Sequence, residues 1–192
     1  QTSERWDVFR YNNMAHNTLT INGKKQLVAG SSTVDNLVSL PDRQSVELDL
    51  TSLYKNEVGY YKRKAAVLSN RYVEIQDSLL AGSGNLTVRW NLLTQAVPQK
   101  VNDKIICLSQ STKKLYLLFE GTEEVTAKAW STKPPTTYEE KNSDTYFTGF
   151  EFQVPANTTR VITVKLVPEG DALLNSLDLG IAGNPLNETF ET

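Results

Sequence analysis

His16 is the residue whose chemistry is most versatile, because it is the one imidazole in 192 residues. Imidazole exchanges protons near neutral pH and binds metal ions. Asn17 follows directly, and its amide could hydrogen-bond a substrate carboxylate or cap a turn. A histidine that only makes hydrogen bonds at the start of a strand is the competing interpretation, so His16 and Asn17 need a structural context.

The patterns around the other reactive side chains do not predict a catalytic role for them. Cys107 lies in an apolar run, which favours a small buried side chain over a nucleophile. Glu123–Glu124 and Glu139–Glu140 are adjacent pairs, and neighbours on a strand point to opposite faces, so neither pair converges on one bond. Asp77 follows an alternating run, where we expect it to end a strand and cap a turn.

Composition excludes several function classes. Lys and Arg number 20 against 22 Asp and Glu, which leaves a net charge of −2 and no basic footprint for nucleic acid. No apolar run approaches the roughly 18 residues of a membrane helix. One cysteine and one histidine exclude a disulfide framework and a multi-histidine metal site built from this chain alone.

The elements that must position these residues are strands. Alternation of polar and apolar residues recurs along the chain, separated by Gly, Pro and Asn turns, and this pattern predicts an all-β antiparallel β-sandwich with little or no helix. We expect one domain over residues 1–192, as the C-terminal part of a longer protein. The expected strands include 18–21, 26–28, 46–50, 61–67, 73–76, 86–90, 105–108, 115–119, 125–130, 147–154 and 161–167.

Four local expectations follow from this pattern. Asn22–Gly23 predicts a tight hairpin that joins 18–21 to 26–28. Residues 147–154 and 161–167 are expected to pair with each other. Asp171 to Leu177 is the best helical candidate, and Gly180 to Thr192 reads as either an ordered strap or a frayed end.

The segment around His16 resembles a known family. Ala15-His16-Asn17-Thr18 enters an alternating strand before Asn22-Gly23 and Gln26, which is similar to the β-sandwich of heparinase II/III family polysaccharide lyases. The runs 61–64, 71–77 and 86–90 resemble strands of the same family. The similarity covers about the first half of the chain, and the His-Asn-Thr block is its specific part.

The resemblance implies a function. Family members cleave polysaccharides that contain uronic acid by β-elimination, in a cleft between an α/α-toroid and the sandwich. Several hold a metal ion with two histidines and one aspartate, and His16 matches the last of those ligands. The other ligands and most catalytic residues precede the block in the family, so this chain lacks them. We therefore expect zinc only in a full-length parent, no cofactor in the isolated chain, and no activity from it alone.

Residues near the block complete the predicted site. Tyr11 is a third catalytic candidate beside His16 and Asn17, and Arg5, Arg10 and Trp6 are expected to bind an anionic polysaccharide. The alternative is that these are solvated charges and packed rings. We expect Trp90 in the core, because it is in phase with Leu86 and Val88 on its strand. Trp130 could lie in the core or at the surface, and at least two of the three tryptophans are expected to be buried.

The resemblance also implies the surroundings of the protein. The expected partners are the anionic polysaccharide and an N-terminal α/α-toroid, with neither nucleic acid nor membrane, and the expected location is a bacterial periplasm or the exterior. A non-catalytic carbohydrate-binding module and a purely structural sandwich remain the alternatives.

Overall fold

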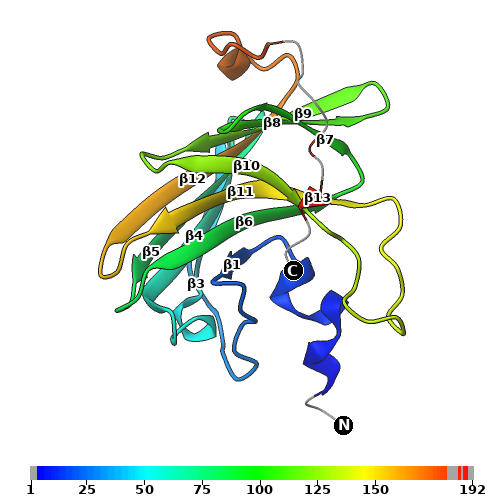
Figure 1. Cartoon of the computed structure of the whole chain (residues 1–192). Helices are drawn as coiled ribbons and strands as arrows, with labels where there is room; N and C mark the ends of the chain where they lie inside the picture. The colour runs from blue at the N-terminus through cyan, green and yellow to red at the C-terminus, as the bar shows by residue number, and fades with distance from the viewer. Residues whose placement is uncertain (1–3, 181–185, 187, 190–192) are drawn as a thin grey trace.

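Two β-sheets packed face to face make up the computed structural model, which describes residues 4–180, 186 and 188–189 (Figure 1). The predicted all-β antiparallel sandwich with little helix is confirmed. The helical segments of the described residues are 3₁₀ turns: η1 (Glu4–Asp7), η2 (Phe9–Tyr11), η3 (Asn13–Ala15), η4 (Thr51–Leu53) and η5 (Ala172–Leu174). None of the helices in these described ranges has the length and apolar character needed to cross a membrane.

The smaller sheet has the strand order β1-β6-β11-β10-β13, and the larger sheet has the order β2-β3-β4-β5-β12-β9-β8-β7. Neighbouring strands are antiparallel, except that β13 lies parallel to β10. The strands are β1 (Leu19–Ile21), β2 (Thr33–Leu40), β3 (Arg43–Asp49), β4 (Val58–Leu68), β5 (Tyr72–Ala81), β6 (Leu86–Thr94), β7 (Val97–Asn102), β8 (Ile105–Gln110), β9 (Lys113–Glu120), β10 (Val125–Trp130), β11 (Tyr146–Val154), β12 (Thr159–Pro168) and β13 (Glu188–Thr189).

The core lies between the two sheets and follows the period-two pattern of the sequence. Phe150 of the smaller sheet packs against Phe119 of the larger sheet, with 5.4 Å between the ring centroids, and Trp90 packs against Phe150 at 6.3 Å. Trp90 is buried, as predicted, and Trp130, for which the sequence left both alternatives open, is buried as well. Residues on one strand face therefore bury their aromatic area against the opposite sheet.

The Asn22–Gly23 turn forms as predicted, but the hairpin after it does not. Both residues have positive φ, and Ile21 bridges Lys24. The expected strand 26–28 is wrong, because the Asn13 side chain accepts from the Gln26 backbone N–H at 2.7 Å and donates to the Lys24 carbonyl at 3.0 Å. The Asn13 side chain therefore makes the hydrogen bonds that a neighbouring strand would make to the Lys24 carbonyl and the Gln26 N–H.

The predicted pairing of 147–154 with 161–167 is also wrong. β11 lies between β6 and β10 in the smaller sheet, whereas β12 lies between β5 and β9 in the larger sheet. The segment 155–158 therefore crosses from one sheet to the other. Alternation identifies a strand but not its partner, because every strand in a sandwich has the same period.

Three smaller expectations are corrected or limited. Asp77 does not end a strand but lies buried inside β5, opposite Arg63. The helical candidate is reduced to η5, whose cap Asp171 accepts from the Leu173 backbone N–H. The segment 180–192 falls mostly outside the described residues, and its described β13 adds a short strand beside β10.

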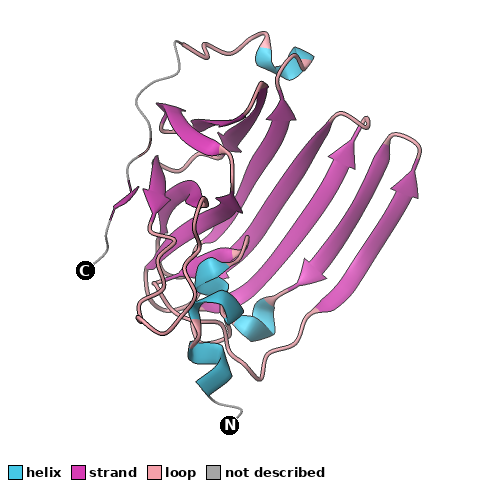
Figure 2. Ribbon diagram, turned by 90° about the vertical axis from the view of Figure 1, so that its right-hand side faces the viewer, coloured by secondary structure: helices cyan, strands magenta, loops and turns pink. Residues whose placement is uncertain are grey.

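The larger sheet extends beyond the smaller one at β2 and β3 (Figure 2). One row of paired residues runs across the larger sheet, from Leu37 through Val46 and Ala65 to Ile75. Side chains in one row face the same way. Ile75 packs against the core, yet Leu37 is 78% exposed. The core face of the larger sheet thus continues into an uncovered apolar surface. We call the surface formed by β2, β3 and the adjoining part of β4 the overhang.

Candidate functional site

The N-terminal turns are built by two buried asparagines. The Asn12 side chain accepts from the Met14 N–H at 3.0 Å and donates to the Val8 carbonyl at 3.1 Å, while Asn13 holds the 24–26 segment as described above. Short polar side chains that bind nearby backbone stabilise such turns where no strand ladder is available. They fix η1 to η3 against the mouth of the sandwich, where Figure 1 shows them in dark blue below β1 and β6.

A long loop holds the same turns from the other side. The backbone N–H of Phe9 donates to the Glu139 carboxylate at 2.6 Å. The Arg10 guanidinium donates to the Asn142 side chain and to the carbonyls of Glu140 and Lys141, at 3.0 to 3.3 Å. Arg10, which the sequence suggested for substrate binding, therefore anchors the loop 131–145 in this structure.

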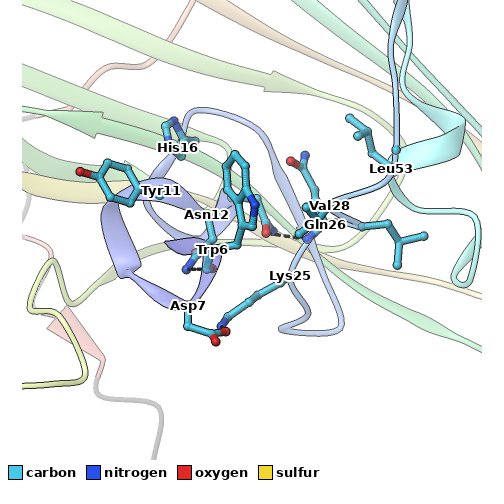
Figure 3. Close-up of a pocket in the computed structure, with 12 residues that line it drawn as sticks. Trp6, Asp7, Tyr11, Asn12, His16, Lys25, Gln26, Val28 and Leu53 are labelled. Atoms are coloured by element: carbon cyan, nitrogen blue, oxygen red, sulfur yellow. Dashed lines mark hydrogen bonds and ion pairs between the residues drawn. The ribbon is translucent and has the colours of Figure 1, made fainter. Parts of the chain in front are cut away.

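A cavity of about 420 Å³ lies between the N-terminal turns and the segment 24–30 (Figure 3). Figure 3 shows Trp6 in the middle of the view, with Tyr11 and His16 to one side and Leu53 to the other. The full lining consists of Trp6, Asp7, Tyr11, Asn12, Asn13, His16, Lys25, Gln26, Leu27, Val28, Gly30 and Leu53. The structure thus brings three sequence-predicted site residues to one cavity: His16, Tyr11 and Trp6.

The imidazole of His16 is exposed and has one defined hydrogen bond. Its Nε2 lies 3.0 Å from the carbonyl oxygen of Arg10. A carbonyl oxygen only accepts, so Nε2 carries the proton and the lone pair of the neutral ring belongs to Nδ1. This tautomer gives His16 one nitrogen that can accept a proton or bind a metal.

The backbone that follows His16 is held by side chains from three strands or turns. Arg63 Nη1 donates to the Asn17 carbonyl at 2.9 Å, Asn91 Nδ2 to the Thr18 carbonyl at 3.1 Å, and the Tyr54 hydroxyl to the Leu19 carbonyl at 2.6 Å. Three consecutive carbonyls therefore each accept from a distant side chain. We call Arg63, Asn91 and Tyr54 the cradle.

The cradle is anchored in a buried ion pair. Arg63 binds Asp77 through Nε and Nη2 at 2.7 and 2.8 Å, and the Tyr61 hydroxyl donates to the same carboxylate at 2.7 Å. Burial raises the pKa of Tyr61 well above its ordinary 10.0 and also raises the pKa of Tyr54. Burial by itself lowers the pKa of Arg63, but Asp77 and the hydrogen bonds to it raise the pKa overall, so the guanidinium stays charged.

A zinc ion at His16 would need further ligating side chains near the imidazole. Within the described ranges, no three His, Cys, Asp or Glu side chains gather where they could hold a metal ion. Three protein ligands are the usual minimum for a catalytic zinc. The part of the chain that the structure describes thus supplies His16 as at most one ligand of a larger set.

The remaining predicted residues lie around the cavity rather than in it. Asn17 is exposed, and its side-chain oxygen accepts from the Leu93 N–H at 2.8 Å, so this side chain fastens the block to β6. Arg5 lies over the rings of Trp6 and Tyr11, at 5.2 and 5.4 Å from their centroids. This arrangement combines a positive charge with two exposed aromatic rings.

Sequence reasoning missed the residues behind the site. Tyr54 and Lys25 were not singled out, and Gln26 was named only as part of the family resemblance. The Gln26 amide donates to the Tyr54 hydroxyl at 2.7 Å, and Lys25 lines the cavity. No motif marks Tyr54, because it lies in a turn region 35 residues from the carbonyl it binds. For Arg63 and Asp77, a hairpin centred on Asn70 would have placed them opposite each other.

Comparison with known proteins agrees with this architecture. No curated protein matches the sequence closely enough to be counted as a relative. The heparan sulfate lyase HepC from Pedobacter heparinus superposes with a TM-score of 0.62 at 15% identity, covering 80% of this chain and 24% of that one. A heparinase III gene product gives 0.61 at 17% identity, covering 82% and 24%.

These identities show the fold alone, and the chain spans about a quarter of the length of the solved chains it matches. A family model described as "Heparinase II/III-like, C-terminal" matches residues 1–177. Because that model covers most of the sequence, this chain belongs to the heparinase II/III-like family, in which it corresponds to the C-terminal region.

Proposed function

We propose that this β-sandwich forms one wall of the active-site cleft of a polysaccharide lyase that cleaves uronate-containing chains by β-elimination. The observation that carries the proposal is the cavity shared by His16, Tyr11 and Trp6, with Lys25 in its lining. A surface imidazole beside positive charge suits an anionic sugar better than a purely structural role does. Periplasmic or extracellular location belongs to the same proposal and rests on the family resemblance.

The proposed chemistry assigns each side chain a task that its geometry permits. Lys25 and Arg5 attract the sugar carboxylate or sulfate, and the faces of Trp6 and Tyr11 stack against sugar rings. With Nε2 committed to the Arg10 carbonyl, Nδ1 of His16 is the nitrogen that takes part in proton transfer or in a metal set completed by other parts of a longer protein. The isolated chain is expected to bind substrate weakly and to be inactive.

The decisive experiment uses the longer parent protein and follows the ultraviolet absorbance of the unsaturated uronate product. Heparan sulfate, hyaluronan and alginate are supplied separately, and the wild-type protein is compared with His16→Ala and Tyr11→Ala. We expect product with at least one polymer and a loss of about 100-fold or more in kcat for His16→Ala, as for removal of a proton-transfer group.

Tyr138→Ala is the matched control for Tyr11→Ala, because Tyr138 is also an exposed tyrosine but does not line the cavity. The control is expected to retain wild-type activity. Unchanged activity in His16→Ala would reduce the sandwich to a scaffold, and absence of product with every polymer would overturn the lyase proposal.

Carbohydrate binding without catalysis is the second candidate, and the exposed Trp6–Arg5–Tyr11 group favours it. It predicts that the 192-residue chain alone is retained on immobilised heparan sulfate at low salt. Trp6→Ala should then abolish retention, whereas Tyr138→Ala should leave it unchanged.

A further inference from the structure

We propose that Arg63 is a positioning residue for His16: clamped by Asp77 and Tyr61, it holds the Asn17 carbonyl and so fixes the direction in which the chain leaves the imidazole-bearing residue. The inference deepens the proposed function and rests on it for its catalytic consequence. Its structural part stands on the contacts of the described residues alone.

Arg63 holds the peptide unit that joins Asn17 to Thr18. A peptide unit is planar, so a hydrogen bond that fixes its carbonyl also fixes the N–H at its other end. That N–H belongs to Thr18 and donates to the His16 carbonyl at 2.8 Å. Arg63 therefore acts on His16 through one peptide unit and one backbone hydrogen bond.

On its N-terminal side, His16 is held by two carbonyls of the N-terminal turns. Its ring is tied to the Arg10 carbonyl through Nε2, and its backbone N–H donates to the Asn13 carbonyl at 3.2 Å. The imidazole thus has a tether on the N-terminal side and a tether on the C-terminal side. Loss of the Arg63 contact would free the Asn17 carbonyl, which is the acceptor nearest to His16 on the C-terminal side. The Asn17 side chain would still hold the Leu93 N–H, and the other two members of the cradle would still hold the next two carbonyls.

An arginine at position 63 can bind Asp77 and the Asn17 carbonyl at the same time. A guanidinium is a planar fork, so binding Asp77 through Nε and Nη2 aims Nη1 in a fixed direction, which here is the Asn17 carbonyl. Lysine keeps the charge that balances Asp77 but has a single ammonium on a flexible stem. Arg63→Lys is therefore expected to preserve the buried ion pair while releasing Asn17.

The test uses the fact that the chain has one histidine. In a proton–carbon correlation spectrum of the 192-residue chain labelled at histidine, the imidazole gives one isolated signal. We expect Arg63→Lys to shift or broaden this signal by more than its linewidth while the far-ultraviolet circular dichroism stays unchanged. If that variant fails to fold, Tyr61→Phe, which removes only one contact to Asp77, should move the signal in the same way but less.

Arg71→Lys is the matched control, because Arg71 also grips an aspartate, Asp171, through Nε and Nη2. The Arg71 side chain is 47% exposed, whereas that of Arg63 is 12% exposed, and neither Arg71 nor Asp171 is among the residues that line the cavity. The control should leave the imidazole signal in place. An unchanged signal in Arg63→Lys, or an equal shift in Arg71→Lys, overturns the proposal.

The activity of the parent protein provides the second measurement. Arg63→Lys should lower kcat by about 10- to 100-fold with little change in KM, since small misplacements of a reacting group have effects of that size. Combined with His16→Ala, it should cause little further loss, because it acts through His16. Additive losses overturn the positioning role. Absence of any product in the wild type defeats the proposed function instead, and the imidazole signal still decides the role of Arg63.

Discussion

Asp77 shows how one buried residue supports an exposed one. It is fully buried and accepts hydrogen bonds from both Arg63 and Tyr61. Both of its oxygens accept from Arg63, and these two contacts hold the guanidinium in the orientation that reaches Asn17. The surface block therefore depends on a carboxylate that solvent does not touch.

Removal of this carboxylate should be costly. Asp77→Ala leaves the charge of Arg63 buried without its partner, and we expect a loss of about 3 to 5 kcal/mol in the free energy of unfolding, measured by urea denaturation. Asp7→Ala is the control, because Asp7 forms an exposed ion pair with Lys25 that is worth at most about 1 kcal/mol. Equal losses in the two variants would contradict the buried-pair account.

The two buried tyrosines predict a stability change in alkali. Burial raises the pKa of Tyr61 and Tyr54 above the ordinary value of 10.0, so the folded chain keeps these protons to a higher pH than the unfolded chain does. Their stabilising contribution is complete below pH 10.0 and decreases as the pH rises above it, because the unfolded state then loses protons first. Urea midpoints measured from pH 8 to 11 should fall above pH 10, and less steeply in Tyr61→Phe.

The sequence could have located part of this residue network. Strands were expected at 61–67 and 73–76, on either side of Ser69–Asn70. In a hairpin centred on Asn70, residues whose numbers sum to 140 face each other, and Arg63 and Asp77 are such a pair. No comparable local rule reaches Tyr54 and Leu19, whose hydrogen bond depends on how the smaller sheet lies over the larger one. Local register is predictable from turns, while contact between sheets is not.

β11 shows the same distinction for a whole element. Its bounds were predicted to within a residue, since its apolar alternation is strong, but its neighbours were assigned wrongly. Gly149 lies in its middle with φ near +156°, and a Cβ placed there would lie 1.8 Å from the Trp90 carbonyl oxygen. A glycine at this position allows the backbone of β11 to approach β6 closely.

Gly149→Ala should therefore disrupt the smaller sheet. We expect a loss of about 3 kcal/mol or more in the free energy of unfolding, because neither backbone can move without breaking ladder hydrogen bonds. Gly84→Ala, in a loop with no atom within 4 Å of the added carbon, should change stability by less than about 0.5 kcal/mol. Thermal unfolding followed by circular dichroism distinguishes the two.

For the whole molecule, the unequal widths of the two sheets matter most. Among the described residues the larger sheet has eight strands and the smaller sheet five, and the overhang keeps an apolar face in contact with solvent. Alternation in 33–40 is weak, which is why β2 was not predicted, and its mostly exposed residues explain the weak pattern.

Two leucines on the larger sheet should report where the core ends. Leu79 is fully buried, whereas Leu37 on the overhang is 78% exposed. Leu79→Ala should lower the free energy of unfolding by about 2 to 5 kcal/mol, and Leu37→Ala by less than about 0.5 kcal/mol. A large loss in Leu37→Ala, measured by urea denaturation of this chain, would mean that the overhang is covered in solution.

The crossing segment 155–158 also affects how the chain can fold during synthesis. β5 and β9 are joined in the larger sheet only through β12, and β6 and β10 are joined in the smaller sheet only through β11. A ribosome that adds about 5 to 20 residues per second therefore has to reach β11 and β12 before the strands on either side of them can join into one sheet. Until residues 146–168 emerge, the four strands β2–β5 and the three strands β7–β9 can form only separate parts of the larger sheet, with unpaired edges. This makes 146–168 the stretch at which chaperone binding or aggregation competes with folding.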